Sequence, residues 1–284
     1  MSMAIGTCIR RDTWREKLKQ AIGAGFEAVE LYCNDTLGTL DLAAVADEAR
    51  DFIGDAGVRI SAIGLYGNPL GSEEHRSELI RCIGQARMLG ARVVSTFAGA
   101  VPGRSVPESI GDFQRVFGDL VSRAEDAGVR IGLENAPMHG HWYQPTCNIA
   151  FCPKAWELLF EAVPSPALGL TWEPAHQLQQ LMDPAPQLRR WLPRVVHLHG
   201  KDASVDWEAI RRDGAWFGMH YCEHRFPGRG ACDWTELLRI LREGGYDGDL
   251  CVEGFHDPDY GADREFEGQR EALAYLRACR EQIQ

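Results

Sequence analysis

Short runs of apolar and β-branched residues recur along the chain, and each is followed by a polar turn and a longer segment with helical periodicity. The segment 42–53 is typical, because its apolar residues would share one face of a helix: Leu42, Val45, Ala46, Ala49, Phe52 and Ile53. The short runs are nearly continuous, as in buried parallel strands. They predict strands at about residues 4–8, 27–32, 58–64, 92–97, 130–134, 168–172, 195–199 and 249–253.

Eight strands that alternate with eight helices predict either a closed barrel or a doubly wound open sheet. We favour a TIM (β/α)8 barrel, because no GxGxxG follows the first strand, as it would in a dinucleotide-binding sheet. No linker or low-complexity tract divides the chain, so a single domain over residues 1–284 is expected. The longest connections follow the fifth, seventh and eighth strands, at the face where barrel active sites are built.

The charge, hydropathy and cysteine content of the chain limit the classes of function that it can have. The chain has 284 residues, a formal net charge of −11 and only four Lys, at positions 17, 19, 154 and 201. The net negative charge argues against a nucleic-acid-binding surface, which would need a basic face. No stretch approaches the roughly 20 apolar residues of a membrane span. The nine Cys form no CxxC pair, which favours free thiols, a reducing compartment and a cytoplasmic location.

Four of the predicted strands end at a side chain that can bind a metal. These residues are Glu134, Glu173, His199 and Glu253. Three carboxylates at one place would repel one another unless a cation lay between them. Oxygen ligands with one imidazole suit one divalent ion, with Mn²⁺ favoured and Mg²⁺, Co²⁺ or Zn²⁺ possible.

Strand alternation extends this prediction to the layer beneath the site. Residues two positions earlier share the orientation of the four candidate ligands. They are Gly132, Thr171, His197 and Cys251. We therefore expect a mostly small layer beneath the ligands, with His197 as the exception.

At these residues the sequence resembles the xylose isomerase-like superfamily of sugar isomerases and epimerases. The resemblance covers essentially the whole chain, through LENAP, EPAH, HLHGKD, FPGRGACDW and GYDGDLCVEG in that order. It implies that Glu134, Glu173, His199 and Glu253 bind the metal, and that Glu134 and Glu253 also exchange protons with the substrate. Family members usually carry Asp where this chain has Glu173.

The resemblance also implies substrate contacts. His176, three residues after the sixth-strand acid, is the residue that typically contacts substrate, and Arg225 resembles a basic residue that binds substrate hydroxyl groups. His224 could fill the place of Arg225. Lys201 could bind a substrate phosphate or carboxylate, and a structural pairing with a nearby acid is favoured.

The loops offer further candidates. His139 and His141 could chelate a metal but are more often solvent-facing in such a loop. Trp142, Tyr143, Trp216 and Phe217 could cover the substrate or pack the loops.

These expectations together favour a metal-dependent isomerase or epimerase of a small sugar or keto-sugar. One of Glu134 and Glu253 would remove a proton next to a carbonyl, and the other would return it, through an enediolate whose charge the metal offsets. A dehydratase acting on an inosose-like ketone would share the same first step. An apurinic endonuclease is disfavoured because its three-zinc cluster needs His residues on the third and fourth strands. The strands predicted at 58–64 and 92–97 contain no His. A non-catalytic sugar-binding barrel also stays open, and assembly as a dimer or tetramer is implied by family likeness only.

Overall fold

The computed structural model describes residues 3–215, 218 and 220–283. Eight parallel strands follow one another in the order β1-β10-β7-β6-β5-β4-β3-β2, which is that of a closed barrel. They are β1 (Ile5–Arg10), β2 (Ala28–Tyr32), β3 (Arg59–Gly64), β4 (Val93–Thr96), β5 (Arg130–Glu134), β6 (Leu168–Trp172), β7 (Val195–Gly200) and β10 (Leu250–Val252). The predicted eight-stranded parallel barrel is therefore confirmed.

Ten α-helices and four short 3-10 helices occur in the described part of the chain. The α-helices are α1 (Trp14–Ala24), α2 (Leu42–Ile53), α3 (Glu73–Gln85), α4 (Val106–Ala127), α5 (Pro153–Ala162), α6 (Pro174–Gln179), α7 (Pro184–Trp191), α8 (Trp207–Asp213), α9 (Trp234–Glu243) and α10 (Glu265–Glu281). The 3-10 helices are η1 (Arg11–Thr13), η2 (Ala86–Leu89), η3 (Leu192–Arg194) and η4 (Ala262–Arg264). Helix α2 coincides with the predicted stripe at 42–53, and its Leu42, Val45, Ala46 and Ala49 are buried.

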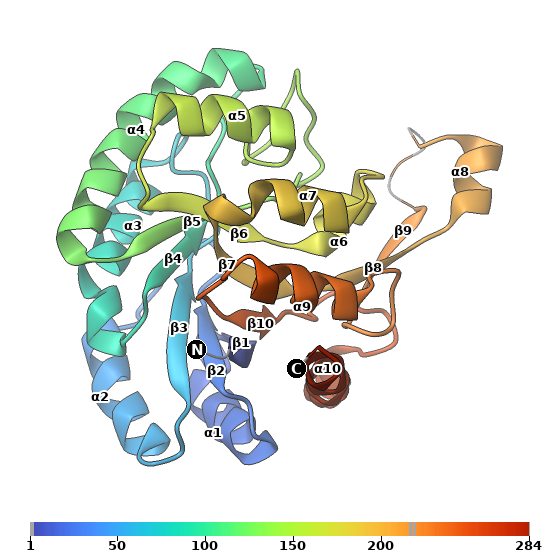
Figure 1. The fold of residues 1–284 in the computed structure, drawn as a ribbon. Helices are drawn as coiled ribbons and strands as arrows, with labels where there is room; N and C mark the ends of the chain where they lie inside the picture. The colour runs from blue at the N-terminus through green and yellow to red at the C-terminus, as the bar shows by residue number, and fades with distance from the viewer. Residues whose placement is uncertain (1–2, 216–217, 219, 284) are drawn as a thin grey trace. The chain divides into compact units, whose positions relative to one another are not determined.

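The chain forms two compact units. One comprises residues 8–172 and 194–197, and the other comprises residues 1–7, 173–193 and 198–284. In the first unit, helices α2 to α5 lie along the outside of β2 to β6 (Figure 1). Gly132 and Thr171, two residues of the layer expected beneath the site, are closely packed in its interior: Ser95 Oγ lies 2.7 Å from Thr171 Oγ1, and a Cβ on Gly132 would lie 2.2 Å from the same Thr171 oxygen.

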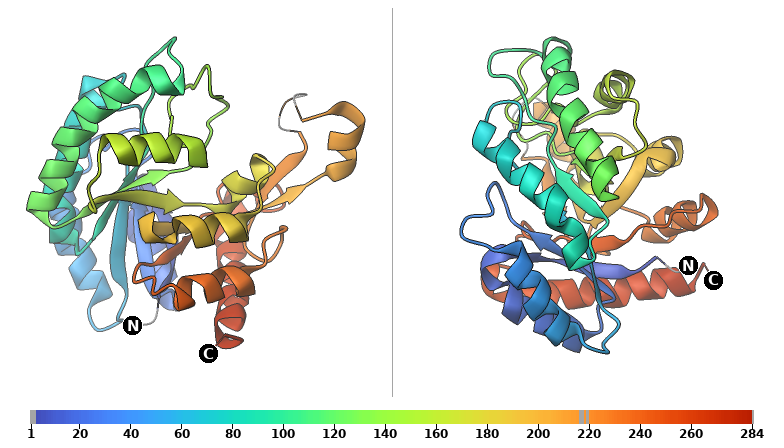
Figure 2. Two further views of the ribbon diagram at one scale, coloured as in Figure 1. Left: turned by 45° about the horizontal axis from the view of Figure 1, so that its top comes forward. Right: turned by 90° about the vertical axis from the view of Figure 1, so that its left-hand side faces the viewer.

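The second unit contains an element that the sequence pattern did not predict. Strands β8 (Asp202–Val205) and β9 (Cys222–Arg225) form an antiparallel pair within the long connection 202–232. Helix α8 lies at the far end of this hairpin (Figures 1 and 2). Trp216 and Phe217, two of the aromatic loop residues considered above, lie outside the described residues, and Tyr143 is exposed.

Asp202 joins the hairpin to the segment that leads into α9. Its buried carboxylate accepts hydrogen bonds from the backbone N–H of Ala203 at 2.8 Å and of Cys232 at 3.0 Å, and from Trp234 Nε1 at 2.9 Å. A Cβ on Gly230 would lie 2.2 Å from this carboxylate, so the last glycine of the PGRG turn permits the close approach. Asp202 therefore has a structural role in the HLHGKD segment.

We expect Asp202→Ala to lower the free energy of unfolding by about 2–3 kcal/mol, because its buried donors would lose a common acceptor. Asp202→Asn keeps one carbonyl acceptor and should lose less. Urea unfolding followed by tryptophan fluorescence measures both. A loss below about 1 kcal/mol for the Ala variant would show that water or neighbouring groups replace the carboxylate.

None of the nine Cys residues forms a disulfide, in agreement with the expectation of free thiols. Within the described ranges, no helix is long and apolar enough to cross a membrane.

Candidate active site

Glu173 stands at the junction of β6 and α6. Proline at 174 restricts the preceding residue to extended backbone, and Glu173 has φ −132° and ψ 119°. The side chain is fully buried. The Trp-Glu-Pro sequence therefore ends the strand, begins the helix and holds a carboxylate at the carboxyl end of β6.

His199 and Glu253 come from neighbouring strands of the same unit. Strand β10 pairs with β7 so that Cys251 lies beside His199, and the backbone N–H of Glu253 donates to Gly200 O at 3.2 Å. His199 Nδ1 lies 3.0 Å from Glu253 Oε2 and 3.4 Å from Glu173 Oε2. The imidazole is thus located between two carboxylates, and all three side chains are buried.

Lys201 and His176 complete this cluster. Lys201 Nζ donates to Glu253 Oε1 at 2.7 Å and lies 3.6 Å from Glu173 Oε1. His176 Nε2 lies 3.1 Å from Glu173 Oε1, and its Nδ1 lies 2.9 Å from Gln179 Oε1. Of the two readings of Lys201, the structure displays the pairing with nearby acids. Five residues that the sequence singled out therefore lie together: Glu173, His176, His199, Lys201 and Glu253.

The carboxylates of Glu173 and Glu253 differ in their affinity for protons. Burial raises the pKa of Glu173, although the charges of His176 and Lys201 oppose this effect. Burial alone would also raise the pKa of Glu253, but the Lys201 ammonium and the His199 imidazole hold it well below its usual range. Glu253 is therefore ionised at neutral pH, whereas the negative charge of Glu173 is less well compensated by its neighbours.

This cluster could bind a divalent cation. One donor atom each from Glu173, His199 and Glu253 lie within 4.8 Å of one another. Two ligands of one ion, each about 2.0–2.2 Å from it, can be up to about 4.4 Å apart, so donor atoms at this range of separations can share one ion. Two carboxylates and one imidazole are also a donor set that suits such ions.

Glu134 ends β5 in the other unit, where its side chain is buried. The loop that follows is held by Asn148, whose side chain donates to the carbonyl oxygens of Glu134 at 2.9 Å and of Ala136 at 2.8 Å. Asn148 Oδ1 accepts from Ala98 N and Ala150 N, both at 3.0 Å. The backbone at Glu134 is well supported, and its role as ligand and proton carrier stays a prediction.

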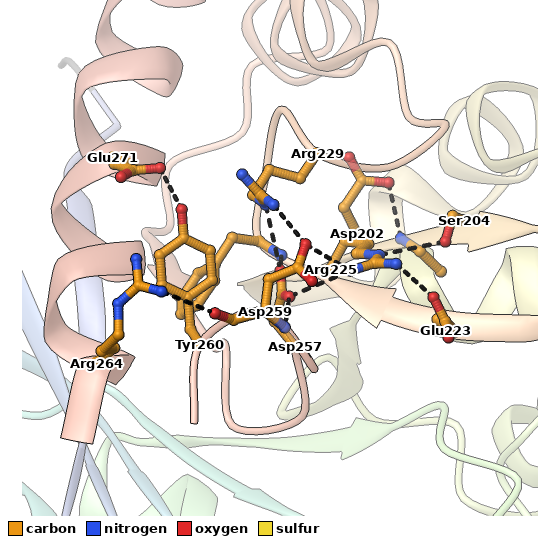
Figure 3. A network of polar contacts seen from close by, with 12 residues as sticks. Asp202, Ser204, Glu223, Arg225, Arg229, Asp257, Asp259, Tyr260, Arg264 and Glu271 are labelled. Carbon is orange, nitrogen blue, oxygen red and sulfur yellow. Dashed lines mark hydrogen bonds and ion pairs between the residues drawn. The ribbon is translucent and has the colours of Figure 1, made fainter. Parts of the chain in front are cut away.

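Arg225 lies in a network of ion pairs (Figure 3). Its guanidinium contacts Glu223, lies 3.0 Å from Asp259 Oδ2 and 3.4 Å from Asp257 Oδ1, and donates to Ser204 Oγ at 3.3 Å. The predicted contact of Arg225 with substrate would compete with these partners. The two loop histidines, His139 and His141, are exposed.

The sequence pattern missed a buried polar group in the first unit. Glu30 of β2 accepts a hydrogen bond from the Tyr66 hydroxyl at 2.7 Å and lies 2.8 Å from His197 Nε2. Glu30 and His197 are almost completely inaccessible. A charged residue within the apolar run AVELY was the available signal, because such a residue is rarely buried without a partner.

Residues 18–279 match the family described as "Xylose isomerase-like TIM barrel". The chain belongs to this family. It is 26% identical over 264 residues to a 3-dehydroshikimate dehydratase of Pseudomonas putida (strain KT2440), which covers 90% of the chain and 38% of that protein. It is also 26% identical over 220 residues to an inosose dehydratase of Klebsiella pneumoniae subsp. pneumoniae, covering 72% of the chain and 71% of that protein.

The chain thus spans well under half the length of the Pseudomonas relative. Among solved structures, 3-keto-D-glucoside 4-epimerase from E. coli superposes with a TM-score of 0.72 at 18% identity, over 98% of this chain and all of that one. This likeness shows the fold. The two sequence relatives are dehydratases by name and the structural neighbour is an epimerase by name, and these activities are those of the relatives.

Proposed function

We propose that the protein is a divalent-metal-dependent lyase that removes water from a small polyhydroxy ketone. The observation that carries this proposal is the convergence of Glu173, His199 and Glu253 with the Lys201 ammonium in one buried cluster. The dehydratases that resemble this chain in sequence support the same reaction class. Removal of water from such a ketone requires a metal ion, a base and a proton donor at the site.

Glu173 and His199 would hold the metal together with Glu253, and Glu134 is the proposed fourth ligand. When bound, a divalent ion would polarise the ketone carbonyl and stabilise negative charge on its oxygen. The donor set does not distinguish strongly among ions, and Mn²⁺ stays the favoured one.

Glu253 is the proposed base. Its carboxylate would take the proton from the carbon next to the carbonyl, and Lys201 keeps this carboxylate ionised beforehand. The Lys201 ammonium would donate a proton to the hydroxyl group on the next carbon, which leaves as water while the carbon–carbon double bond forms. Glu253 Oε1 lies 2.7 Å from Lys201 Nζ, so the abstracted proton can return to the amine. The net change is a ketone converted to an unsaturated ketone plus water.

Epimerisation is the second candidate, because it shares the first step. It requires a second proton carrier on the opposite face of the substrate, for which Glu134 was predicted. The two reactions give different products: an epimer has the mass of its substrate, whereas dehydration removes one water.

The test uses chelator-treated protein reloaded separately with Mn²⁺, Mg²⁺, Co²⁺ and Zn²⁺. We expect about one ion per chain by plasma mass spectrometry, and loss of that ion in His199→Ala. The loaded protein is then incubated with an inosose or with 3-dehydroshikimate in deuterated water, and products are followed by NMR and mass.

Water loss that depends on the metal would support the lyase, and deuterium incorporation with an epimeric product would support the second candidate. A metal-loaded protein that neither exchanges protons nor releases water from either ketone would contradict both. Glu134→Gln in the same series tests whether that residue is the fourth ligand.

A further inference from the structure

A cavity of about 350 Å³ lies between the loops that follow β2 and β3 and the start of α3, all within the first unit. Its ionisable lining residues are Asp35, Glu74, His75 and Glu78, and none of the residues proposed above for metal binding or catalysis lines it. Asp35 and Glu74 are exposed, so the cavity is open to solvent. Its volume is in the range of pockets that hold small molecules, about 300–1,000 Å³.

His75 is a buried residue of the cavity wall, and one of its ring nitrogens has no partner. Its Nδ1 lies 3.0 Å from the backbone oxygen of Asp35, which can only accept, so Nδ1 carries the proton of this bond. Burial lowers the pKa of His75, against the opposing effects of that backbone oxygen and of the charges of Glu78 and Asp35. The ring is therefore neutral at neutral pH, and Nε2 carries a lone pair. Nε2 is buried without a hydrogen-bond partner in the described part of the chain, which is costly unless a ligand supplies a donor.

The carboxylates of the cavity lack cationic partners. Glu78 accepts hydrogen bonds from Thr36 Oγ1 at 2.9 Å and from the backbone N–H of Leu37 at 3.2 Å, and both donors are neutral. Within residues 3–215, 218 and 220–283, Asp35, Glu74 and Glu78 form no ion pair with Lys or Arg. Three negative charges therefore meet at one small cavity without compensation from its lining.

Two sources of positive charge lie close by, and both are already engaged. Asp35 acts on the charge of Arg11, but this guanidinium pairs with Asp12 at 2.9 Å and donates to the backbone oxygen of Thr36. The N-terminus of α3 is capped by Ser72, whose Oγ accepts from the backbone N–H of His75 at 3.1 Å. The cavity thus keeps an excess of negative charge beside a ring nitrogen that can accept a hydrogen bond.

We propose that this cavity binds a small organic amine in its protonated form, with the imidazole of His75 as an acceptor and the carboxylates of Glu74 and Glu78 as counter-charges. An ammonium group has three N–H donors and no acceptor, so it complements carboxylates and an imidazole lone pair. A bare divalent ion fits less well, because the groups of metal-capable donors within 4.8 Å of one another in the described chain do not include these residues. The site is independent of the proposed lyase chemistry.

The test is calorimetric titration of the full chain with 1,4-diaminobutane, with 1,4-butanediol as the uncharged isostere and with Mg²⁺ alone as the competing cation. Glu74→Gln and Glu78→Gln each remove one charge and keep the shape of the side chain, and His75→Phe removes the acceptor. Glu73→Gln is the matched control, because Glu73 is exposed in the same first turn of α3 and does not line the cavity.

We expect the dissociation constant of the diamine to rise about threefold to fivefold in Glu74→Gln, as for the loss of an exposed ion pair. Glu78→Gln and His75→Phe should raise it about 10-fold or more, because they remove buried or half-buried acceptors of a charged donor. The control should stay within about twofold of wild type. Glu74 is exposed, so its variant keeps the test valid even if the other two fold poorly.

These losses, together with no binding of the diol, would support the amine site. Diamine affinity that is the same in Glu74→Gln and Glu78→Gln as in the control would place binding elsewhere and overturn the site. Equal binding of the diol, or no binding of the diamine tighter than about 1 mM, would also overturn it. Mg²⁺ binding that Glu74→Gln and Glu78→Gln abolish, without binding of the diamine, would replace the amine by a metal and contradict the ligand class.

Discussion

Glu253→Gln is expected to reduce turnover of the ketone substrate by about 10²–10⁴-fold, the usual contribution of a positioned general base. Glutamine keeps the size of the side chain but cannot accept the proton from carbon. It also removes the carboxylate that lies 2.7 Å from Lys201 Nζ, so the proton donor loses its closest partner in the cluster. The measurement is kcat at saturating ketone with Mn²⁺ in excess.

Two controls make the interpretation specific. Glu267→Gln is the matched exchange at an exposed position of the same unit, where Glu267 pairs with Arg264, and it should leave kcat unchanged. Metal content of Glu253→Gln distinguishes a protein that has lost its ion from one that holds the ion and cannot move the proton. Full activity in Glu253→Gln would refute the proposed base, whatever its metal content.

Glu30→Ala is expected to lower the free energy of unfolding by about 2–6 kcal/mol, because two buried polar groups would be left unsatisfied at about 1–3 kcal/mol each. The Tyr66 hydroxyl and His197 Nε2 would both lose this acceptor. Water cannot readily replace the carboxylate, because Glu30 and His197 are almost completely inaccessible and the site lies in the interior of the unit. Guanidinium denaturation followed by circular dichroism measures the change.

Conservative variants separate the contributions of the Glu30–Tyr66 and Glu30–His197 contacts to the free energy of unfolding. Tyr66→Phe removes one donor and should cost about 1 kcal/mol, and Glu30→Gln keeps the side-chain shape and one acceptor. Additive losses in the double variant would mean that the two contacts act independently. If Glu30→Ala costs less than about 1 kcal/mol, the first unit must repack or hydrate this position with little penalty.

The fold was largely predictable because its signals are local. Each parallel strand is a short apolar run, and the longer helices carry an apolar face. The stripe in 42–53 follows from spacing alone. An acid that precedes an apolar run is also a local signal for a helix start: at the start of α9, Asp233 accepts a hydrogen bond from the backbone N–H of Glu236.

The β8–β9 hairpin was not predictable in the same way. Its strands, DASV and CEHR, are four residues each and show no strict alternation of apolar and polar residues. They are stabilised by contacts with remote segments, such as the bonds of Asp202 to Cys232 and Trp234. A pattern that depends on residues thirty positions away leaves no periodic signal in a short window.

By itself, the sequence determined the alternation of strands and helices and which carboxylates and imidazoles stand at strand ends. It did so because strand ends, turns and amphipathic faces are encoded within about ten to fifteen residues. Tertiary structure decided the partners: Lys201 with Glu253, Arg225 with Asp257 and Asp259, His224 beside His176, and Glu30 with His197. Such pairings depend on distances between residues far apart in the chain. Those distances, together with burial, set the charge state of each group and so its chemistry.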